Sequence, residues 1–388
     1  MYSNKIGTCQ NFYPDPDLIA GIPVQETNTE LERLLNDVKG IRSYFSGSNP
    51  FKDPNQEGEL RVKFVEILIK ISDIYRGMGN ISLSDKYLSE AESVQSKINW
   101  RKDPYYPDIN LQLAEAFLKR SNLDKGEMYC RKAEIRLNDP EYQEICKLDY
   151  NHIGMQKEAG YRAKIEVIRG EKNIILGNTQ QAQRNFNKAI VYLKKKFDLH
   201  LFLRTMIGQS EATNNLTYLE TIFGMKTEQV AELARKELSG SGSAMTLIEQ
   251  LSKEDYNQFY ARAVSYLGIS DNRQMAEKYA LKGIDKDLLI KAIVRLGNIY
   301  SYSCDNKNLD KFVYPLYKAA LNVTDIMDKP YLRSEALLGL AEISYRKQEY
   351  SKAIEKYKLI LKLLQNEPAD LWLKKIVIQR LATIRKPH

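Results

Sequence analysis

The stretch AEISYRKQEYSKAIEKYKLIL, residues 341–361, contains two amphipathic segments joined by a short polar bend at 347–349. Apolar and small residues recur at intervals of three and four on both sides of this bend, which indicates helices rather than strands. Small residues stand twelve apart, at Ala341 and Ala353, and a tyrosine follows each of them by four residues. We therefore expect a hairpin of two closely packed helices. Such a hairpin leaves one apolar side uncovered, which predicts stacking against further hairpins.

The same layout recurs along the chain. In five segments, the residue equivalent to Ala341 is followed twelve positions later by a small residue equivalent to Ala353. These pairs are Ser72 and Ser84, Ala114 and Gly126, Gly170 and Ala182, Val264 and Ala276, and Ala341 and Ala353. A sixth segment opens at Leu296-Gly297, with a bend lengthened by about four residues around 304–308. The long gap between Gly170 and Val264 predicts a degenerate hairpin within 199–238.

These segments resemble tetratricopeptide repeats (TPR), whose pattern places Leu-Gly and then Tyr on the first helix, and Ala, Phe or Tyr, and Ala on the second. The resemblance covers roughly residues 57–365, although several intervals exceed the usual repeat length and the pattern's Trp is missing. It implies an all-α fold, a right-handed superhelical array of antiparallel helix hairpins (a TPR-like solenoid), with the first helices lining a concave surface. A generic helical bundle is the alternative fold.

Composition divides the chain further. Prolines mark an extended N-terminal arm, a Ser-Gly run marks a flexible loop, and a final helix is expected to cap the array by burying Leu371, Trp372 and Ile376. The predicted order is 1–28 arm, 29–56 N-terminal helix and loop, 57–238 N-terminal array, 239–243 flexible loop, 244–366 C-terminal array and 367–388 capping helix and tail.

Polar residues on the first helices are the candidates for partner contact. The first two clear hairpins predict an acidic groove, opposed only by Lys70 and Arg76: Glu66, Asp73, Asp108 and Glu115. Later hairpins predict a basic patch and a tyrosine contact at the other end: Arg262, Lys291, Arg295, Asn298 and Tyr302. The alternative is that these charges are solvated helix faces.

One known binding mode of TPR proteins is disfavoured. Members that hold a C-terminal carboxylate of heat-shock chaperones place Asn directly after the small position of the first helix. Only Asn298 matches, while acids that would repel a carboxylate occupy four equivalent places: Asp73, Glu115, Glu171 and Glu342. The sequence therefore argues against a full carboxylate clamp.

Catalytic and targeting signals are sparse. The sequence contains no phosphate-binding loop, nucleophile elbow or HExxH pattern, and only three histidines. Its four cysteines form no CxxC pair and are expected to be reduced, which favours the cytoplasm. No run of 18 apolar residues predicts a membrane span, and the N-terminus lacks the pattern of a secretory signal. We expect no catalytic residue, no metal site and no cofactor.

The net charge of +8 is concentrated in two places. Residues 151–200 carry ten Lys and Arg against four Asp and Glu, and residues 351–388 carry nine against three, so each range has an excess of +6. We expect a non-enzymatic scaffold or adaptor that binds a peptide or helix of a protein partner in its groove. An RNA-binding helical-repeat protein is one alternative, because the basic ranges could contact phosphates. A peptide-sensing regulator of the Rap type is another, and the oligomeric state stays open.

Overall fold

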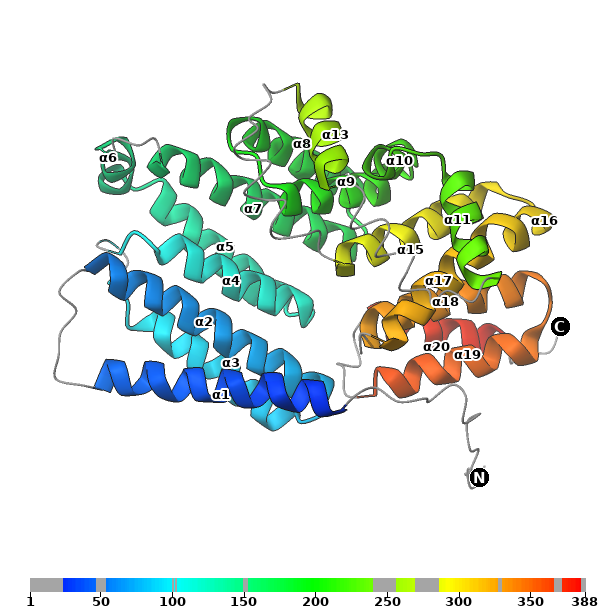
Figure 1. The fold of residues 1–388 in the computed structure, drawn as a ribbon, viewed down its shortest axis with the longest axis horizontal. Helices are drawn as coiled ribbons and strands as arrows, with labels where there is room; N and C mark the ends of the chain where they lie inside the picture. The colour runs from blue at the N-terminus through cyan, green and yellow to red at the C-terminus, as the bar shows by residue number, and fades with distance from the viewer. Residues whose placement is uncertain are drawn as a thin grey trace, which may run out of the picture.

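The computed structural model describes residues 24–46, 54–99, 101, 103–148, 153–239, 256–268, 286–326, 330–365 and 372–384. Within these ranges the regular structure is all helical, without strands, and no helix is long and apolar enough to cross a membrane. Most helices pack in consecutive pairs (Figure 1): α2 (Pro54–Gly77) with α3 (Ile81–Ser96), α4 (Tyr106–Lys119) with α5 (Leu123–Leu137), α7 (Ile153–Ile175) with α8 (Thr179–Lys195), α9 (Leu199–Thr213) with α10 (Thr217–Phe223), α15 (Lys286–Ser303) with α17 (Tyr314–Ile326), and α18 (Pro330–Arg346) with α19 (Tyr350–Leu363).

The hairpin predicted at 341–361 is confirmed. Helix α18 ends just before the polar bend at 347–349, and α19 begins just after it. Ala341 and Ala353 are both fully buried. Gln348 adopts the left-handed backbone conformation, with φ 63°, which allows the chain to reverse within three residues.

Other hairpin bends have the same geometry. Their second-to-last residue also has a positive φ: Gly79 (77°), Ser121 (58°) and Gly177 (75°). An asparagine follows each of them. The side chain of Asn80 accepts a hydrogen bond from the backbone N–H of Leu83 at 3.1 Å, and Asn122 accepts one from Lys125 at 3.2 Å. Asn80 and Asn122 thus cap the second helix with their side chains, whereas Asn178 occupies the same position without such a bond.

Residues spaced by twelve meet across the bends. The Ser72 hydroxyl donates to the backbone carbonyl of Ser84 at 2.7 Å. Gly126 lies so close to α4 that a Cβ placed on it would be 3.3 Å from the carbonyl oxygen of Ala114. Because the two backbones nearly touch here, only small side chains fit.

An aromatic ring on a second helix joins one pair to the next. Phe186 of α8 is fully buried against Gly170 of its own pair and Gly208 of the following pair. A Cβ on either glycine would lie within 2.6 Å or 2.1 Å of the ring, respectively. The ring therefore needs a glycine on both first helices.

Tyr317 of α17 repeats this arrangement between Gly297 of α15 and Gly339 of α18. In both cases the ring precedes the glycine of the next pair by 22 residues (208 − 186 and 339 − 317). Within the pair, the spacing is 20 residues for Tyr317 (317 − 297) but 16 for Phe186 (186 − 170), a difference of four. The spacing from the ring to the glycine of the next pair is thus the same in both cases. The spacing within the α15–α17 pair is four residues longer than in the α7–α8 pair.

The extra residues lie mainly in helical structure. The sequence predicts a bend lengthened around 304–308, but only Cys304 and Asp305 are non-helical there. The short α16 (Asn306–Asn308) and the π-helical turn η2 (Leu309–Val313) follow directly and continue into α17. A π turn accommodates additional residues without ending a helix, so the surplus does not displace Tyr317.

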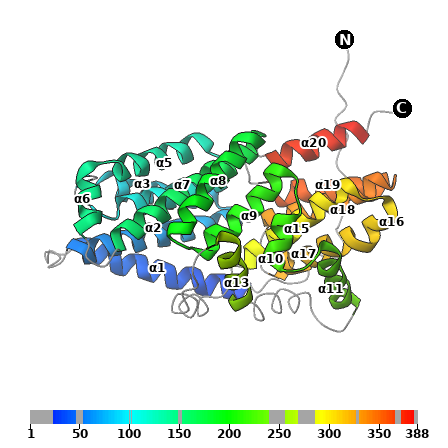
Figure 2. The ribbon, with the colours of Figure 1, turned by 90° about the horizontal axis from the view of Figure 1, so that it is seen from above.

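The first helices of the pairs form a series in which each contacts the next, from α2 through α4, α7, α9 and α15 to α18. Helices α9 and α10 form a pair within 199–238, where the sequence predicts a degenerate hairpin. Helices α1–α5 occupy one half of the long axis and α15–α20 the other, with α7–α10 between them (Figures 1 and 2). Helix α11 (Thr227–Ser239) packs on α17, and α13 (Tyr256–Leu267) packs on α10. Residues 240–243 of the predicted loop and Ala276 lie outside the described ranges.

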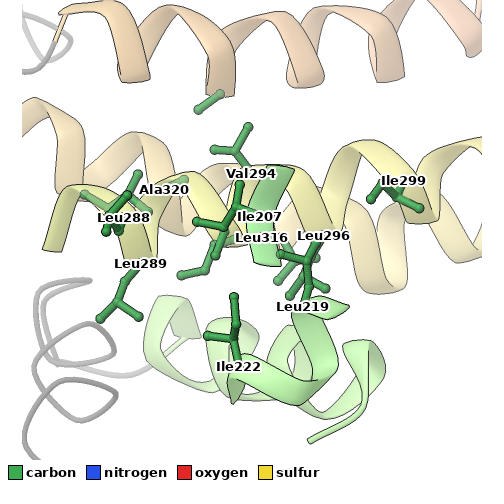
Figure 3. Packing of buried hydrophobic residues seen from close by; sticks show 14 of the residues in the cluster. Ile207, Leu219, Ile222, Leu288, Leu289, Val294, Leu296, Ile299, Leu316 and Ala320 are labelled. Atoms are coloured by element: carbon green, nitrogen blue, oxygen red, sulfur yellow. The ribbon is translucent and has the colours of Figure 1, made fainter. Parts of the chain in front are cut away.

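Two clusters of buried apolar residues meet within α7. Ile165 and Ile168 belong to the N-terminal cluster, whereas Ala163 and Val167 belong to the C-terminal one. Helices α9, α10, α15 and α17 converge in the second cluster, as Figure 3 shows for Ile207, Leu219, Ile222, Leu296 and Leu316. Helix α7 therefore connects the two halves of the core.

Two helices, one at the N-terminal end and one before α7, pack outside the helix pairs. Helix α1 (Val24–Ser46) packs on α2, and α6 (Pro140–Leu148) packs mainly on α7. Helix α1 begins before residue 29, so the last residues of the predicted arm are helical.

The C-terminal helix α20 (Trp372–Ile384) packs on α19, but with a different face from the one predicted. Trp372 and Ile376 are only half-buried, and Leu371 lies outside the described residues. The Trp372 indole N–H donates to the hydroxyl of Tyr331 at 2.6 Å, which holds the ring at the edge of the contact. The buried residues of α20 are Leu373, Lys374, Val377 and Leu381.

Candidate functional site

The series of first helices carries a continuous set of charged side chains. On α4, Glu115 forms ion pairs with Lys164 of α7, at 2.8 Å, and with Arg204 of α9. Arg204 also pairs with Glu171 of α7 at 2.7 Å. One guanidinium on α9 thus connects carboxylates from the two preceding first helices.

Burial and charge oppose each other in this network. Burial alone would raise the pKa of Glu115, but Lys164 and Arg204 outweigh it and hold that pKa far below its usual range. The pKa of Glu171 is lowered in the same way, by Arg204 and more weakly by Lys291 against the effect of burial. Both glutamates are therefore ionised at neutral pH.

A second network continues the series toward the C-terminus. Arg295 of α15 is 6% exposed and forms ion pairs with Glu211 of α9 and, at 2.9 Å, with Glu335 of α18. Burial disfavours the charged guanidinium, but the two carboxylates raise the pKa of Arg295 above its ordinary value. The positive charge of Arg295 is thus satisfied within the chain.

The two networks meet around a small cavity of about 10 Å³. Its lining combines α7, α9 and α15: Glu171, Arg204, Ile207, Gly208, Glu211, Leu288 and Lys291. This volume corresponds to about one water molecule. It is too small for an organic ligand.

At the C-terminal end, the same face is more open. Tyr302 of α15 is 81% exposed, whereas Asn298, one turn earlier, accepts a hydrogen bond from the hydroxyl of Tyr317 at 2.7 Å. Burial raises the pKa of Tyr317, although Ser301 and Arg295 act against this; Tyr302 and Glu342 add weaker effects that raise it. Glu342 of α18 in turn pairs with Arg380 of α20 at 2.9 Å.

The predicted acidic residues of the N-terminal hairpins lie in different surroundings. Glu66 is exposed and pairs with Lys70 of its own helix at 2.7 Å. Asp73 pairs with the buried Arg120 at 2.7 Å. Arg76 is half-buried near the end of α2.

Asp108 accepts a hydrogen bond from the hydroxyl of Tyr161 on α7. Burial raises the pKa of Asp108, although Tyr161, Lys164 and Lys157 act against this. This carboxyl group therefore differs from Glu115 on the same helix, whose pKa is lowered.

The predicted residues of the later hairpins are also separated. Lys291 and Arg295 lie within the charged series, and Asn298 and Tyr302 follow them on α15. Arg262 lies on α13, where its guanidinium occupies the space that a side chain on Gly224 would need. The structure thus brings Glu115, Lys291 and Arg295 into one series and places Arg262 elsewhere.

Sequence reasoning missed the partners that complete this series. They are Lys164, Arg204, Glu211, Glu335 and Arg380. The available signal was the recurrence of acids at one position of successive first helices, at Glu115 and Glu171. Like charges on neighbouring helices require a cation between them, and a search for one leads to Arg204.

Among the described residues, no three His, Cys, Asp or Glu side chains are placed to hold a metal ion. The thiol of Cys130 is buried and that of Cys304 is half-buried, and both are free. A scan against protein-family models and a search of curated proteins found no match for this chain.

Proposed function

We propose that this chain is a non-enzymatic scaffold or adaptor built from TPR-like repeats. In this proposal, the helix pairs stack as a right-handed superhelix, and the first helices form its concave surface. That surface binds an extended peptide or a helix of a protein partner. Helix-in-groove and extended-peptide recognition both require such a long, preformed surface.

The observation that carries the proposal is the unbroken series of contacts among the first helices. The repeated placement of Phe186 and Tyr317 against glycines of successive pairs supports a common repeat geometry. Helices that follow one another with one register present equivalent positions at regular intervals, which is how repeat proteins build extended binding surfaces.

The charge pairing suggests where on this surface a peptide makes its contacts. Glu115 and Arg295 are already paired with groups of the chain itself, so a ligand would have to break these pairs to use them. Tyr302 is not covered in this way, because most of its side chain faces solvent. Exposed tyrosine combines apolar area with a polar tip and is frequent among residues that dominate binding energy. We therefore place the main contact at the C-terminal end of the face, around Asn298 and Tyr302.

A peptide-display experiment tests this function. A random peptide library is selected on the immobilised full chain, and the enriched peptide is titrated against wild type and Tyr302→Ala by fluorescence polarisation. We expect the substitution to weaken binding about tenfold, equivalent to about 1.4 kcal/mol. The exposed position of Tyr302 makes a change in stability greater than about 0.5 kcal/mol unexpected.

Tyr314→Ala is the matched control, because Tyr314 is 43% exposed but lies on α17, the second helix of the same pair. It should leave peptide affinity unchanged. Failure to enrich any peptide, or equal effects of both substitutions, would reject the proposal. Binding of single-stranded RNA with a steep salt dependence, in place of peptide binding, would favour the RNA-binding alternative.

A further inference from the structure

A second surface lies on α5, away from the face of the first helices. A shallow groove of about 470 Å³ is lined mainly by α5. Six lining residues belong to α5 and one to α7: Asp124, Glu127, Met128, Arg131, Lys132, Ile135 and Lys172. None of these residues lies on α15, which carries Asn298 and Tyr302, so this groove is separate from the main contact of the proposed peptide surface.

Two large apolar side chains in this groove are exposed to solvent. Met128 is 39% exposed and Ile135 is 60% exposed. They are seven residues apart (135 − 128) and so share one face of the helix, separated by roughly 10 Å at 1.5 Å per residue. This spacing matches apolar residues at i and i+7, two turns apart, on a partner helix.

One carboxylate that lines the groove and one beside it, Glu127 and Glu134, are paired with cations. Glu127 contacts Arg169 and Lys172, each at 3.2 Å, and more weakly Arg131 at 3.4 Å. Glu134 pairs with Arg169 at 2.8 Å. The pKa of Glu127 is lowered by Arg169 and Lys172 despite its burial.

Positive charge is therefore in excess around the groove. Arg131 is 72% exposed, and Lys188 on the neighbouring α8 is 63% exposed while it helps to lower the pKa of Glu134. Five basic groups face four carboxylates, a net charge of +1 (5 − 4): Arg131, Lys132, Arg169, Lys172 and Lys188 against Asp124, Glu127, Glu134 and Glu166. The exposed side of α8 adds Arg184 and Lys195.

We propose that this groove binds the apolar face of an acidic amphipathic helix of a partner protein. Met128 and Ile135 contact two apolar residues about two turns apart on that helix. Carboxylates flanking its apolar face pair with Arg131 and Lys188. Nucleic acid fits less well, because phosphates could use the cations but would leave the two aliphatic side chains without a counterpart. Met is also common on surfaces that accept partner helices.

The test uses a stapled 15-residue helix with Leu at i, i+4 and i+7 and Glu at the flanking positions as a fluorescent probe. Two comparison peptides carry Lys in place of Glu, or Ser in place of Leu. In anisotropy titrations with the full chain, both comparison peptides should bind at least tenfold more weakly than the acidic probe. The double variant Met128→Ser/Ile135→Ser and the double variant Arg131→Glu/Lys188→Glu should each lose at least tenfold affinity for the acidic probe.

Ile378→Ser is the matched control, since Ile378 is 52% exposed on α20 and is expected to leave probe affinity unchanged. Tyr302→Ala should also leave it unchanged, which separates this surface from the proposed peptide site. The proposal is overturned if the acidic probe does not bind, if the Lys peptide binds equally, or if the apolar double variant binds like wild type. It is also overturned if a single-stranded oligonucleotide displaces the probe and binds the apolar double variant as tightly as wild type.

Discussion

At the residue scale, the contact between one aromatic ring and two glycines explains why the helix pairs repeat in a fixed register. Tyr317 is 2% exposed, and its hydroxyl is held by Asn298, so the ring has little freedom to move. Gly297 and Gly339 leave the space that it fills. The small positions recognised in the sequence are thus determined by what lies opposite them. The sequence pattern pointed to Gly297 as a small position, but not to Gly339, and it did not show that one ring contacts two successive pairs.

Gly339→Ala should therefore destabilise the protein. The added Cβ would lie 2.3 Å from the Tyr317 ring, which has to shift within a packed core. Such overpacking costs about 1–3 kcal/mol and outweighs the gain of about 0.5–1 kcal/mol from replacing glycine within a helix. We expect a net loss of about 1–2 kcal/mol in urea unfolding followed by circular dichroism.

Gly40→Ala provides the comparison, because Gly40 also lies within a helix and nothing is within 4 Å of its added Cβ. It should stabilise the protein by about 0.5–1 kcal/mol. The explanation of the glycine positions is wrong if Gly339→Ala is as stabilising as Gly40→Ala.

At the element scale, α20 shows how a helix can be predicted correctly while its buried face is not. The apolar pattern places a helix near the C-terminus, and a helix is there. Its sequence has apolar residues on more than one side, including Trp372, Leu373, Ile376, Val377 and Ile378. Periodicity alone does not indicate which of these sides is buried; the packing of α20 on α19 determines it.

Val377→Asp should loosen α20. Val377 is fully buried, so the substitution places a charge in an apolar contact and is expected to cost at least about 2 kcal/mol. The expected readout is faster hydrogen exchange across 372–384 together with a lower urea midpoint. Ile378→Asp, one residue further but 52% exposed, should change stability by less than about 0.5 kcal/mol. Equal effects at the two positions would contradict the observed orientation of α20.

At the scale of the whole molecule, charge pairs connect first helices that are distant in sequence. Glu115 and Arg204 are 89 residues apart and lie on α4 and α9, with α7 between them. Arg295 joins α9 to α18 through α15. These ion pairs join different helix pairs, so they stabilise the packing of one pair against the next.

Two carboxyl groups on α4 are expected to respond in opposite ways to substitution. The folded-state pKa of Glu115 lies below its unfolded value of about 4.5, so its stabilising contribution is complete above pH 4.5 and is lost as the pH falls further. Glu115→Gln should cost about 2 kcal/mol at pH 7, a value reduced from that of a fully buried pair because Arg204 keeps Glu171 as its partner. The difference from wild type should shrink below pH 4.5.

The charge of Asp108 is expected to have the opposite effect on stability. Its folded-state pKa is raised above the unfolded value of 3.8, so ionisation disfavours the folded state as the pH rises above 3.8. Asp108→Asn keeps an oxygen for the Tyr161 hydroxyl and removes this charge, so it should leave stability at pH 7 unchanged or higher. Urea midpoints measured from pH 3 to 7 for both variants provide the check. If both substitutions destabilise equally at pH 7, the two carboxyl groups do not differ as described.

The amino-acid sequence by itself determined the helical class, the pairing of neighbouring helices and the bends between them. These features depend on contacts a few residues apart: the three-and-four periodicity, the residues spaced by twelve, and turns such as the polar bend at 347–349. The tertiary structure decided which charges meet, because Arg204 and Glu115 become neighbours only after three first helices have packed. It likewise decided which side of α20 is buried and that Arg295 is paired with carboxylates, since both depend on distances between helices that no local pattern encodes.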